Sequence, residues 1–190
     1  MPELPEAEVA ARQLRERVVG ATVRDCWIGR EDIVREGLPS LDQYRQAKIA
    51  GVERKGKSVI LHFLCGKEPR FLVAELGMTG LLLFRSTLTK HPQHTHFILH
   101  LDGCCEPDIR YWNPRRFGRL SLLDWAGLDR YVARRFGHDP LTISHEQFLR
   151  VLRATRSRLK SLLMRQQVIA GIGNIYANEI LFRSRLHPNQ

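Results

Sequence analysis

The first residues of the chain combine a potential nucleophile with acids. Pro2 follows the initiator Met1, and routine removal of that methionine would leave the secondary amine of proline as the chain start. An α-amino group has a pKa near ~8, so it is partly unprotonated at neutral pH and can attack a sugar C1′ to form an iminium ion. Glu3 is adjacent as a candidate acid, and Glu6 lies one helical turn further on. The same residues also suit a plain helix start, with Pro5 in the first turn and the acids facing the positive end of the helix dipole.

A lysine before an apolar stretch and an asparagine after two glycines are candidate phosphate contacts. Lys57 directly precedes a predicted strand, where its ammonium could hold a phosphate as a point charge; a solvated lysine is the alternative. Asn174 follows Gly171 and Gly173 and opens a predicted helix, whose free N–H groups attract anions. We expect Asn174 to cap this helix and to bond a phosphate oxygen, although a plain helix–turn–helix hairpin would use the same residues.

Two predicted inter-strand turns carry apolar side chains, one of them beside cations. Met78 lies between Gly77 and Gly80, and Arg115 and Phe117 lie in the turn 113–118. An aromatic side chain at a loop tip beside cations is suited to wedging into a stack of bases. Each of these side chains could instead fold back onto the core.

Positive charge is concentrated in the second part of the chain. The net charge is +10 over 190 residues. Residues 1–109 contain 15 Lys/Arg and 15 Asp/Glu, which cancel, whereas residues 110–190 contain 15 Lys/Arg and 5 Asp/Glu, a surplus of 10. A long polyanion such as DNA or RNA is the natural partner of such a surface, and a solvated basic face is the alternative.

Composition excludes several classes of protein. The content of 43% hydrophobic and 26% charged residues is that of a globular chain, and no run of about 18 apolar residues predicts a membrane span. The start lacks the apolar core of a secretion signal, so we do not expect secretion. The four cysteines have no C-x-x-C spacing, which predicts reduced thiols in a cytoplasm and no zinc finger.

Hydrophobic periodicity predicts an α+β protein. Apolar residues at helical spacing predict a helix over 5–18, and short apolar or alternating runs then predict strands over 22–28, 48–54, 58–64, 71–76, 80–84, 96–101, 109–112 and 119–123. Strands spaced so closely favour an antiparallel β-sandwich or barrel, flanked by the N-terminal helix. Beyond residue 124 the pattern predicts helices over 126–135, 145–154, 158–166 and 174–185. We therefore predict a boundary between a domain 1–125 and a helical domain 126–190.

The ordered motifs resemble those of the formamidopyrimidine-DNA glycosylase / endonuclease VIII family. They are Pro2-Glu3-Leu4-Pro5-Glu6, Gly56-Lys57, Leu76-Gly77-Met78-Thr79-Gly80, Pro114-Arg115-Arg116-Phe117-Gly118 and Ala170-Gly171-Ile172-Gly173-Asn174-Ile175-Tyr176-Ala177-Asn178-Glu179. The resemblance spans essentially the whole chain, and its first and last motifs are the most specific. Leu4 favours the formamidopyrimidine branch.

The resemblance implies a bifunctional base-excision repair enzyme of the bacterial cytoplasm, which associates with the nucleoid when bound to DNA and needs no redox cofactor or catalytic metal. It would be a monomer with an N-terminal β-sandwich and a helix–two-turn–helix domain. Double-stranded DNA carrying an oxidised base or abasic site would lie in the cleft between these domains. The damaged nucleotide would be flipped out, because its C1′ is unreachable while stacked. The implied catalytic residues are Pro2 as the Schiff-base nucleophile, Glu3 as general acid, Glu6 in support, and Lys57. The implied DNA-binding residues are Lys57, Lys160 and Asn174 on phosphates, and Met78, Arg115 and Phe117 in the vacated stack.

Three features depart from the family pattern. Glu75 stands where a histidine is common and adds a negative charge near the DNA side, and Arg165 replaces the aspartate of Leu-Leu-Asp-Gln. The sequence ends at Gln190, before the further helices and the four-cysteine zinc finger that the resemblance leads one to expect. The expected helical domain is therefore incomplete, and the family's structural zinc site is missing.

Four hypotheses follow. The first is a glycosylase/AP lyase for oxidised purines such as 8-oxoguanine and formamidopyrimidines, acting by β,δ-elimination. The second is a truncated remnant that binds DNA with weak turnover or none, because lost phosphate contacts weaken binding. The third is an endonuclease VIII-like enzyme for oxidised pyrimidines. A basic RNA-binding protein would fit the charge but leaves the ordered motifs unexplained.

Overall fold

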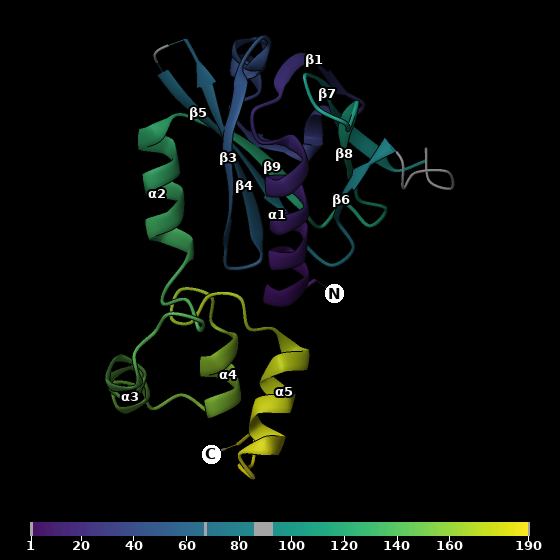
Figure 1. The fold of residues 1–190 in the computed structure, drawn as a ribbon. Helices are drawn as coiled ribbons and strands as arrows, with labels where there is room; N and C mark the ends of the chain where they lie inside the picture. Colours follow the sequence, from purple (N-terminus) through teal and green to yellow (C-terminus); the bar gives the residue numbers. More distant parts are fainter. Residues whose placement is uncertain (1, 67, 86–92, 190) are drawn as a thin grey trace.

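The computed structural model describes residues 2–66, 68–85 and 93–189. Helix α1 (Leu4–Val18) is followed by nine strands and two short 3-10 segments, and then by four helices (Figure 1). The strands are β1 (Thr22–Ile28), β2 (Val34–Glu36), β3 (Lys48–Lys55), β4 (Ser58–Cys65), β5 (Glu68–Glu75), β6 (Leu81–Phe84), β7 (Thr95–Asp102), β8 (Asp108–Trp112) and β9 (Arg119–Leu123). The 3-10 segments are Glu31–Ile33 and Leu38–Tyr44, and the later helices are α2 (Trp125–Arg135), α3 (His145–Arg153), α4 (Leu159–Met164) and α5 (Asn174–Arg183).

The strands form one folded sheet with the order β2-β9-β5-β4-β3-β1-β7-β8-β6. The join between β3 and β1 is narrow, because its register consists of the single pair Thr22 and Lys48. The two halves of the sheet bend around this join and enclose one core, in which Val59 and Leu72 of one half pack in the same cluster as Leu99 and Ile109 of the other. The predicted α+β sandwich with a flanking N-terminal helix is confirmed.

Helix α1 forms because its apolar residues recur at helical spacing. Ala7, Ala11, Leu14 and Val18 lie on one stripe and are buried in the same core as the sheet. Gly20 follows the helix with φ +94°, a conformation that glycine adopts without strain. The N-terminus of α1 points toward the helical part of the molecule, directly above the start of α5 (Figure 1).

One pairing differs from the expected antiparallel pattern. Strand β2 pairs with β9 in parallel, and no strand was predicted there because three residues are too short for a periodicity. Strand β5 also begins earlier than predicted, at Glu68, and includes Pro69. Pro69 lies beyond the stretch of β5 that pairs with β9, which starts at Phe71, so the missing proline N–H costs no bond on that side.

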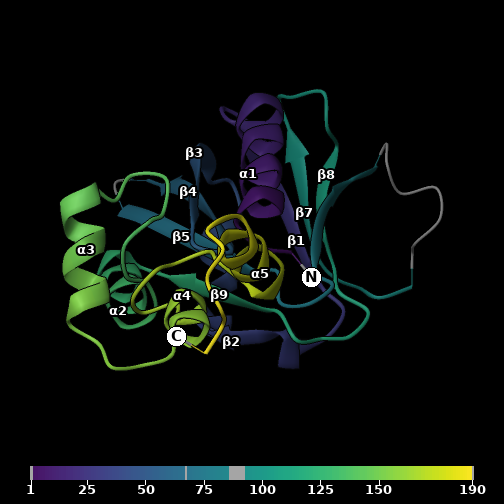
Figure 2. The ribbon, with the colours of Figure 1, turned by 90° about the horizontal axis from the view of Figure 1, so that it is seen from below.

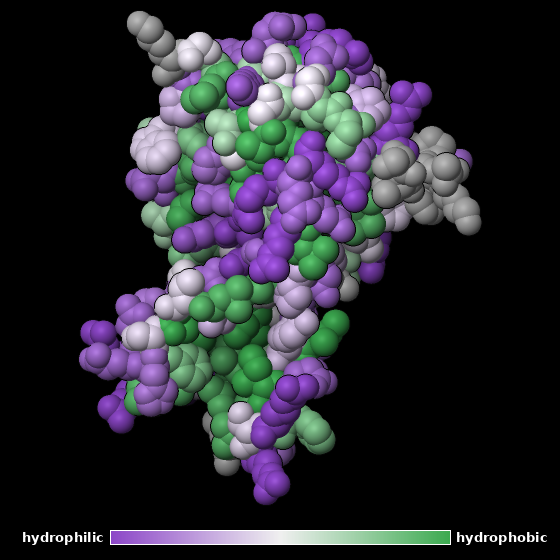
Figure 3. Space-filling model, viewed as in Figure 1, coloured by the Kyte–Doolittle hydropathy of each residue, from purple (hydrophilic) through white to green (hydrophobic). Residues whose placement is uncertain are grey.

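The helices divide between two positions. Helix α2 packs on the outer face of the sheet, where Leu128 and Tyr131 join a second cluster with Ile60 and Phe71. Helices α3, α4 and α5 lie beneath the sheet and share a third, smaller cluster around Leu163 (Figures 1 and 2). Apolar side chains remain exposed on a face of this helical part (Figure 3). The large hydrophobic residues exposed in this part are Leu141, Ile175, Tyr176, Ile180, Phe182 and Leu186.

Charged and backbone contacts join the sheet to the helical part. Arg54 of β3, with only 7% of its side chain exposed, pairs with Glu8 of α1 at 2.9 Å and with Asp139 of the segment after α2. The N–H of Leu4 donates to the carbonyl of Gly171 at 3.0 Å. These contacts hold the N-terminal segment against the turn before α5. The predicted domain boundary at residue 125 stays a prediction.

Candidate active site

The start of the chain is buried between the sheet and α5. Pro2 is buried, and Glu3 is 0% exposed. The N–H of Glu3 donates to the carboxylate of Glu6 at 2.8 Å, one turn into α1. Glu6 thus fixes the backbone beside Pro2. Its supporting role in catalysis stays a prediction.

The carboxylate of Glu3 binds the N-terminus of α5. Its Oε2 accepts from the N–H groups of Gly173 at 2.8 Å and Tyr176 at 3.2 Å, and its Oε1 accepts from Ile175 at 2.9 Å. These are the orphan N–H donors at the positive end of the helix dipole. The arrangement makes Glu3 an acceptor that attaches the N-terminal segment to α5.

This contact corrects the expectation for Asn174. The N-cap of α5 is Gly173, which has no side chain that could cap the helix. Asn174 is the first helical residue and is exposed, while the capping acceptor comes from Glu3. The prediction that Asn174 caps the helix is wrong, because a buried charged carboxylate takes the same donors. Its exposed side chain is left available to solvent, and its phosphate contact stays a prediction.

The two glycines before α5 are required by the close approach of the N-terminal segment. A Cβ at Gly173 would lie 2.4 Å from the Glu3 carboxylate, and a Cβ at Gly171 would lie 2.7 Å from the Leu4 side chain. Gly171 also has φ +106°. The sequence predicted close approach to a neighbour at these glycines, and the neighbour is the start of the chain itself.

A side chain that the sequence reasoning missed holds this turn in place. The amide of Gln166 donates from Nε2 to the Ile172 carbonyl at 2.8 Å and accepts at Oε1 from the Gly171 N–H at 2.9 Å. The amide therefore braces both sides of Gly171. A glutamine five residues before a glycine turn carries no signal in the sequence that would identify this role.

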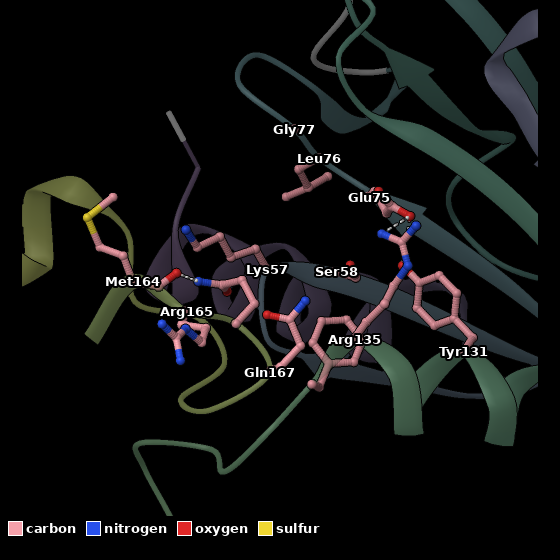
Figure 4. Close-up of a pocket in the computed structure, with 12 residues that line it drawn as sticks. Lys57, Ser58, Glu75, Leu76, Gly77, Tyr131, Arg135, Met164, Arg165 and Gln167 are labelled. Atoms are coloured by element: carbon pink, nitrogen blue, oxygen red, sulfur yellow. Dashed lines mark hydrogen bonds and ion pairs between the residues drawn. The ribbon is translucent and has the colours of Figure 1, made fainter. Parts of the chain in front are cut away.

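Lys57 lies in a cavity of about 410 Å³ between the sheet and the helical part (Figure 4). Burial lowers the pKa of its ammonium, and the nearby Glu3 carboxylate partly offsets this effect. The cavity is lined by Lys57, Ser58, Glu75, Leu76, Gly77, Tyr131, Arg135, Phe136, Met164, Arg165, Gln166 and Gln167. Three of these residues are cations from three separate segments: Lys57 from the turn between β3 and β4, Arg135 from α2, and Arg165 directly after α4. An anion therefore fits the cavity better than a cation.

Pro2 faces a separate cavity of about 330 Å³, lined largely by apolar side chains of α1 and β6. Leu76 lines both this cavity and the one that holds Lys57. Pro2 and Lys57 therefore flank the same leucine at the end of β5. Lys160, half-buried on the first turn of α4, does not line the Lys57 cavity, although Met164 and Arg165 from the end of that helix do.

The turns that carry Met78, Arg115 and Phe117 pack against each other. The N–H of Arg115 donates to Thr79 Oγ1 at 3.4 Å, and a Cβ at Gly77 would lie 2.4 Å from the nitrogen of Gly118. Met78 is 37% and Phe117 57% exposed, and the guanidinium of Arg115 lies 5.2 Å from the centre of the Phe117 ring. The structure thus brings together the three residues that the sequence proposed for the base stack.

The charge of Glu75 requires a correction. Its Oε1 accepts from the Tyr131 hydroxyl at 2.9 Å and pairs with Arg35 at 2.8 Å and with Arg135 at 3.1 Å. Burial and the charge of Glu75 raise the pKa of Tyr131, so the hydroxyl stays protonated and donates. Glu75 is therefore neutralised by its neighbours and is not the free negative charge that was expected.

Within residues 2–66, 68–85 and 93–189, no three His, Cys, Asp or Glu residues lie close enough together to hold a metal ion. The helices in this part of the chain include none that is long and apolar enough to cross a membrane.

Comparison with known proteins gives two family matches. Residues 1–120 match the formamidopyrimidine-DNA glycosylase N-terminal domain, and residues 136–190 match the formamidopyrimidine-DNA glycosylase H2TH domain. A formamidopyrimidine-DNA glycosylase from Thermomicrobium roseum is 38% identical over 99% of this chain and 69% of its own length. One from Heliobacterium modesticaldum is 37% identical over 100% of this chain and 70% of its own length.

Solved structures agree with these matches. The Lactococcus lactis Fpg in complex with DNA containing an abasic site superposes with a TM-score of 0.83 at 26% identity, over 99% of this chain and 69% of that one. A second structure of the same enzyme, noncovalently bound to AP-site DNA, superposes with a TM-score of 0.84 at 26% identity, over 99% of this chain and 72% of that one. The chain thus spans about 70% of the length of these proteins. It belongs to the formamidopyrimidine-DNA glycosylase family.

Proposed function

We propose that the chain is a base-excision repair glycosylase/AP lyase that removes oxidised purines, such as 8-oxoguanine and formamidopyrimidines, from double-stranded DNA. The observation that carries this proposal is the buried Pro2–Glu3 pair, attached to the start of α5 by three N–H hydrogen bonds and close to the cationic cavity of Lys57. Family relatives bind abasic-site DNA in their solved complexes, which supports DNA as the partner. Loss of Met1 is required, since only then is the Pro2 nitrogen an amine.

The reaction divides into two stages. The Pro2 amine attacks C1′ of the flipped nucleotide, the C1′–N bond breaks, and the base leaves with its electron pair and takes up a proton. The bonded Pro2 nitrogen gives up its own proton, the ring opens with a proton delivered to its oxygen, the role proposed for Glu3, and the freed nitrogen lone pair forms the iminium. Loss of a C2′ proton expels the 3′ phosphate, and a second elimination expels the 5′ phosphate. Water finally releases Pro2 from the sugar fragment.

The remaining residues hold the DNA during these steps. Lys57, Lys160 and Asn174 are proposed to bind phosphates around the lesion, and the exposed Phe117, with Met78 and Arg115 beside it, to fill the space left by the flipped nucleotide. The catalytic part is proposed to comprise residues 1–125 and the helical part residues 126–190, acting as a monomer without a cofactor.

Borohydride trapping on a duplex with an abasic or 8-oxoguanine site tests the proposal. Intact mass first establishes that Met1 has been removed, and the iminium is then reduced to a stable covalent adduct. Pro2→Gly should trap roughly tenfold more slowly, because a primary amine replaces the secondary one. Pro5→Ala, in the same segment but without a free amine, should trap at the normal rate. No adduct with the processed 190-residue chain would leave only a DNA-binding function.

Lys57→Met is expected to weaken binding without loss of stability. The pKa of Lys57 is lowered in the folded state by burial, so the charged ammonium carries a desolvation cost that is fully present below the folded pKa and falls as the pH rises through it toward the unfolded pKa. Removing the charge should therefore leave stability at pH 7 unchanged or slightly higher. Affinity for an abasic-site duplex should fall about tenfold, and the slope of log K against log salt should decrease by about 1.

Fluorescence anisotropy at several salt concentrations and urea unfolding measure the two effects of Lys57→Met. The exposed Lys48→Met is the matched control and should change neither quantity. An unchanged salt slope in Lys57→Met would mean that Lys57 contacts no phosphate.

A further inference from the structure

A second cationic cavity adjoins the one that holds Lys57. It has a volume of about 210 Å³ and is lined by four arginines: Arg35, Arg130, Arg134 and Arg135. Tyr131 and Arg135 line both cavities, so the two are adjacent along the last turns of α2. Of the four arginines, only Arg135 also lines the cavity that holds Lys57.

The charge of this arginine cluster is only partly compensated. Glu36 lines the cavity, and Glu75 pairs with Arg35 and Arg135, which leaves four positive charges against two negative ones, a surplus of two. Among the described residues, the guanidiniums of Arg130 and Arg134 have no ion pair or hydrogen bond. Like charges around one cavity repel each other, so the folded chain gains nothing from this surplus by itself.

The helix dipole explains only part of the cluster. Cations at the C-terminal end of α2 are favourable there, which accounts for Arg134 and Arg135. It does not account for Arg35, which reaches the same cavity from β2. Strand β2 and helix α2, which are distant in sequence, therefore both contribute arginines to this cavity.

Glu75 fixes two of the guanidiniums and leaves them able to bind a further anion. Both Arg35 and Arg135 pair with the same oxygen of Glu75, Oε1. Arg135, which Figure 4 draws beside Glu75 and Tyr131, also lies 4.9 Å from the centre of the Tyr131 ring. Each guanidinium has five N–H donors in a planar fork, so most donors remain unused. Both side chains are 39% exposed and accessible from solvent.

We propose that a second phosphate site is formed by Arg35, Arg130, Arg134 and Arg135. It binds the DNA backbone where the duplex continues beyond the cavity that holds Lys57. Glu75 positions Arg35 and Arg135 within this site. The inference rests on the proposed function for its partner. Arg130 and Arg134 are one helical turn apart, about 6 Å along α2, so they lie on one face and can follow consecutive phosphates of one strand.

The effect of duplex length on affinity distinguishes this arginine site from the cavity that holds Lys57. The intact chain and the double variant Arg130→Gln/Arg134→Gln are titrated by anisotropy against two abasic-site duplexes, one short and one extended in both directions from the lesion. The double variant should bind the long duplex about tenfold more weakly than the wild type, with a salt slope lower by about 2, and should match the wild type on the short duplex. Equal losses on both duplexes, or an unchanged slope, would overturn the proposal.

Two controls keep this result independent of the proposed function. Arg12→Gln/Arg24→Gln makes the same charge change at exposed positions of α1 and β1 and should show no dependence on duplex length. The rate of borohydride trapping on the short duplex should be equal in the wild type and in Arg130→Gln/Arg134→Gln. If neither protein is trapped, the proposed glycosylase/AP lyase activity is refuted, but the proposed phosphate site is not. If inorganic triphosphate binds in a way that depends on these arginines while duplex length has no effect, that result would assign the site to small polyphosphates and would reject the DNA backbone as its ligand.

Discussion

A Glu3→Gln variant should lose at least about 100-fold in trapping rate and about 2–4 kcal/mol in the free energy of unfolding. The amide oxygen can replace Oε2, which accepts from Gly173 and Tyr176, but the amide NH₂ then faces the N–H of Ile175. Two donors meet in a site that is 0% exposed, so a hydrogen bond to a charged acceptor is lost and no water restores it. The proposed proton donor is lost in the same change.

Urea unfolding and single-turnover trapping on an abasic-site duplex measure these two effects of Glu3→Gln. Glu16→Gln makes the same chemical change on an exposed position of α1 and should alter neither. A Glu3→Gln variant with normal stability would show that the contact with α5 contributes little. Normal stability together with a normal trapping rate would remove Glu3 from the active site altogether.

Gly173→Ala should displace the N-terminal segment from α5. The backbone of Gly173, at φ −118° and ψ −161°, suits alanine, so the whole effect comes from the added methyl group. That Cβ would lie 2.4 Å from both the carboxyl carbon and Oε1 of Glu3, a distance that forces the buried carboxylate to move. We expect a loss of about 1–3 kcal/mol in unfolding free energy, as for other overpacked sites, and a trapping rate reduced at least about tenfold.

Amide hydrogen exchange reports the displacement in Gly173→Ala directly. The N–H groups of Ile175 and Tyr176 lose their acceptor and should exchange faster, while those of the sheet are unaffected. Gly51→Ala is the matched control, because a Cβ at Gly51 meets nothing within 4 Å. Equal exchange in the two variants would mean that Glu3 does not hold the start of α5.

Local patterns predicted most of the elements and few of their contacts. The helix from Leu4 and the strands β3 and β4 were predicted within one or two residues, because their apolar residues recur at the period of the element. Strand β2 was missed because three residues carry no period, and its parallel pairing with β9 depends on a contact between distant segments. Elements with a clear hydrophobic period could therefore be predicted, whereas β2, which depends on pairing with a distant strand, could not.

The candidate site shows the same limit. The residue types and their order in the motifs pointed to Pro2, Lys57, Phe117 and the glycine turn before α5. The acceptor for the α5 donors could not be predicted, because Glu3 is separated from Gly173 by 170 residues, and an asparagine at the helix start is the better local candidate. The charge of Glu75 was misjudged for the same reason, since its three partners lie on β2 and α2.

The hydrogen bonds of Glu3 also set an order of events during synthesis. Glu3 is among the first residues made, whereas its donors, Gly173, Ile175 and Tyr176, are made 170 or more residues later. At a synthesis rate of about 5–20 residues per second, roughly ten to thirty seconds separate the two ends of this contact. Met1 can be removed during this interval, because Glu3 next to Pro2 is not yet bound to the start of α5. The proposed nucleophile is thus open to processing first and becomes part of the proposed site only after the helical part has left the ribosome. A ribosome-bound fragment would therefore carry the Pro2 amine without the contacts of Glu3 with α5.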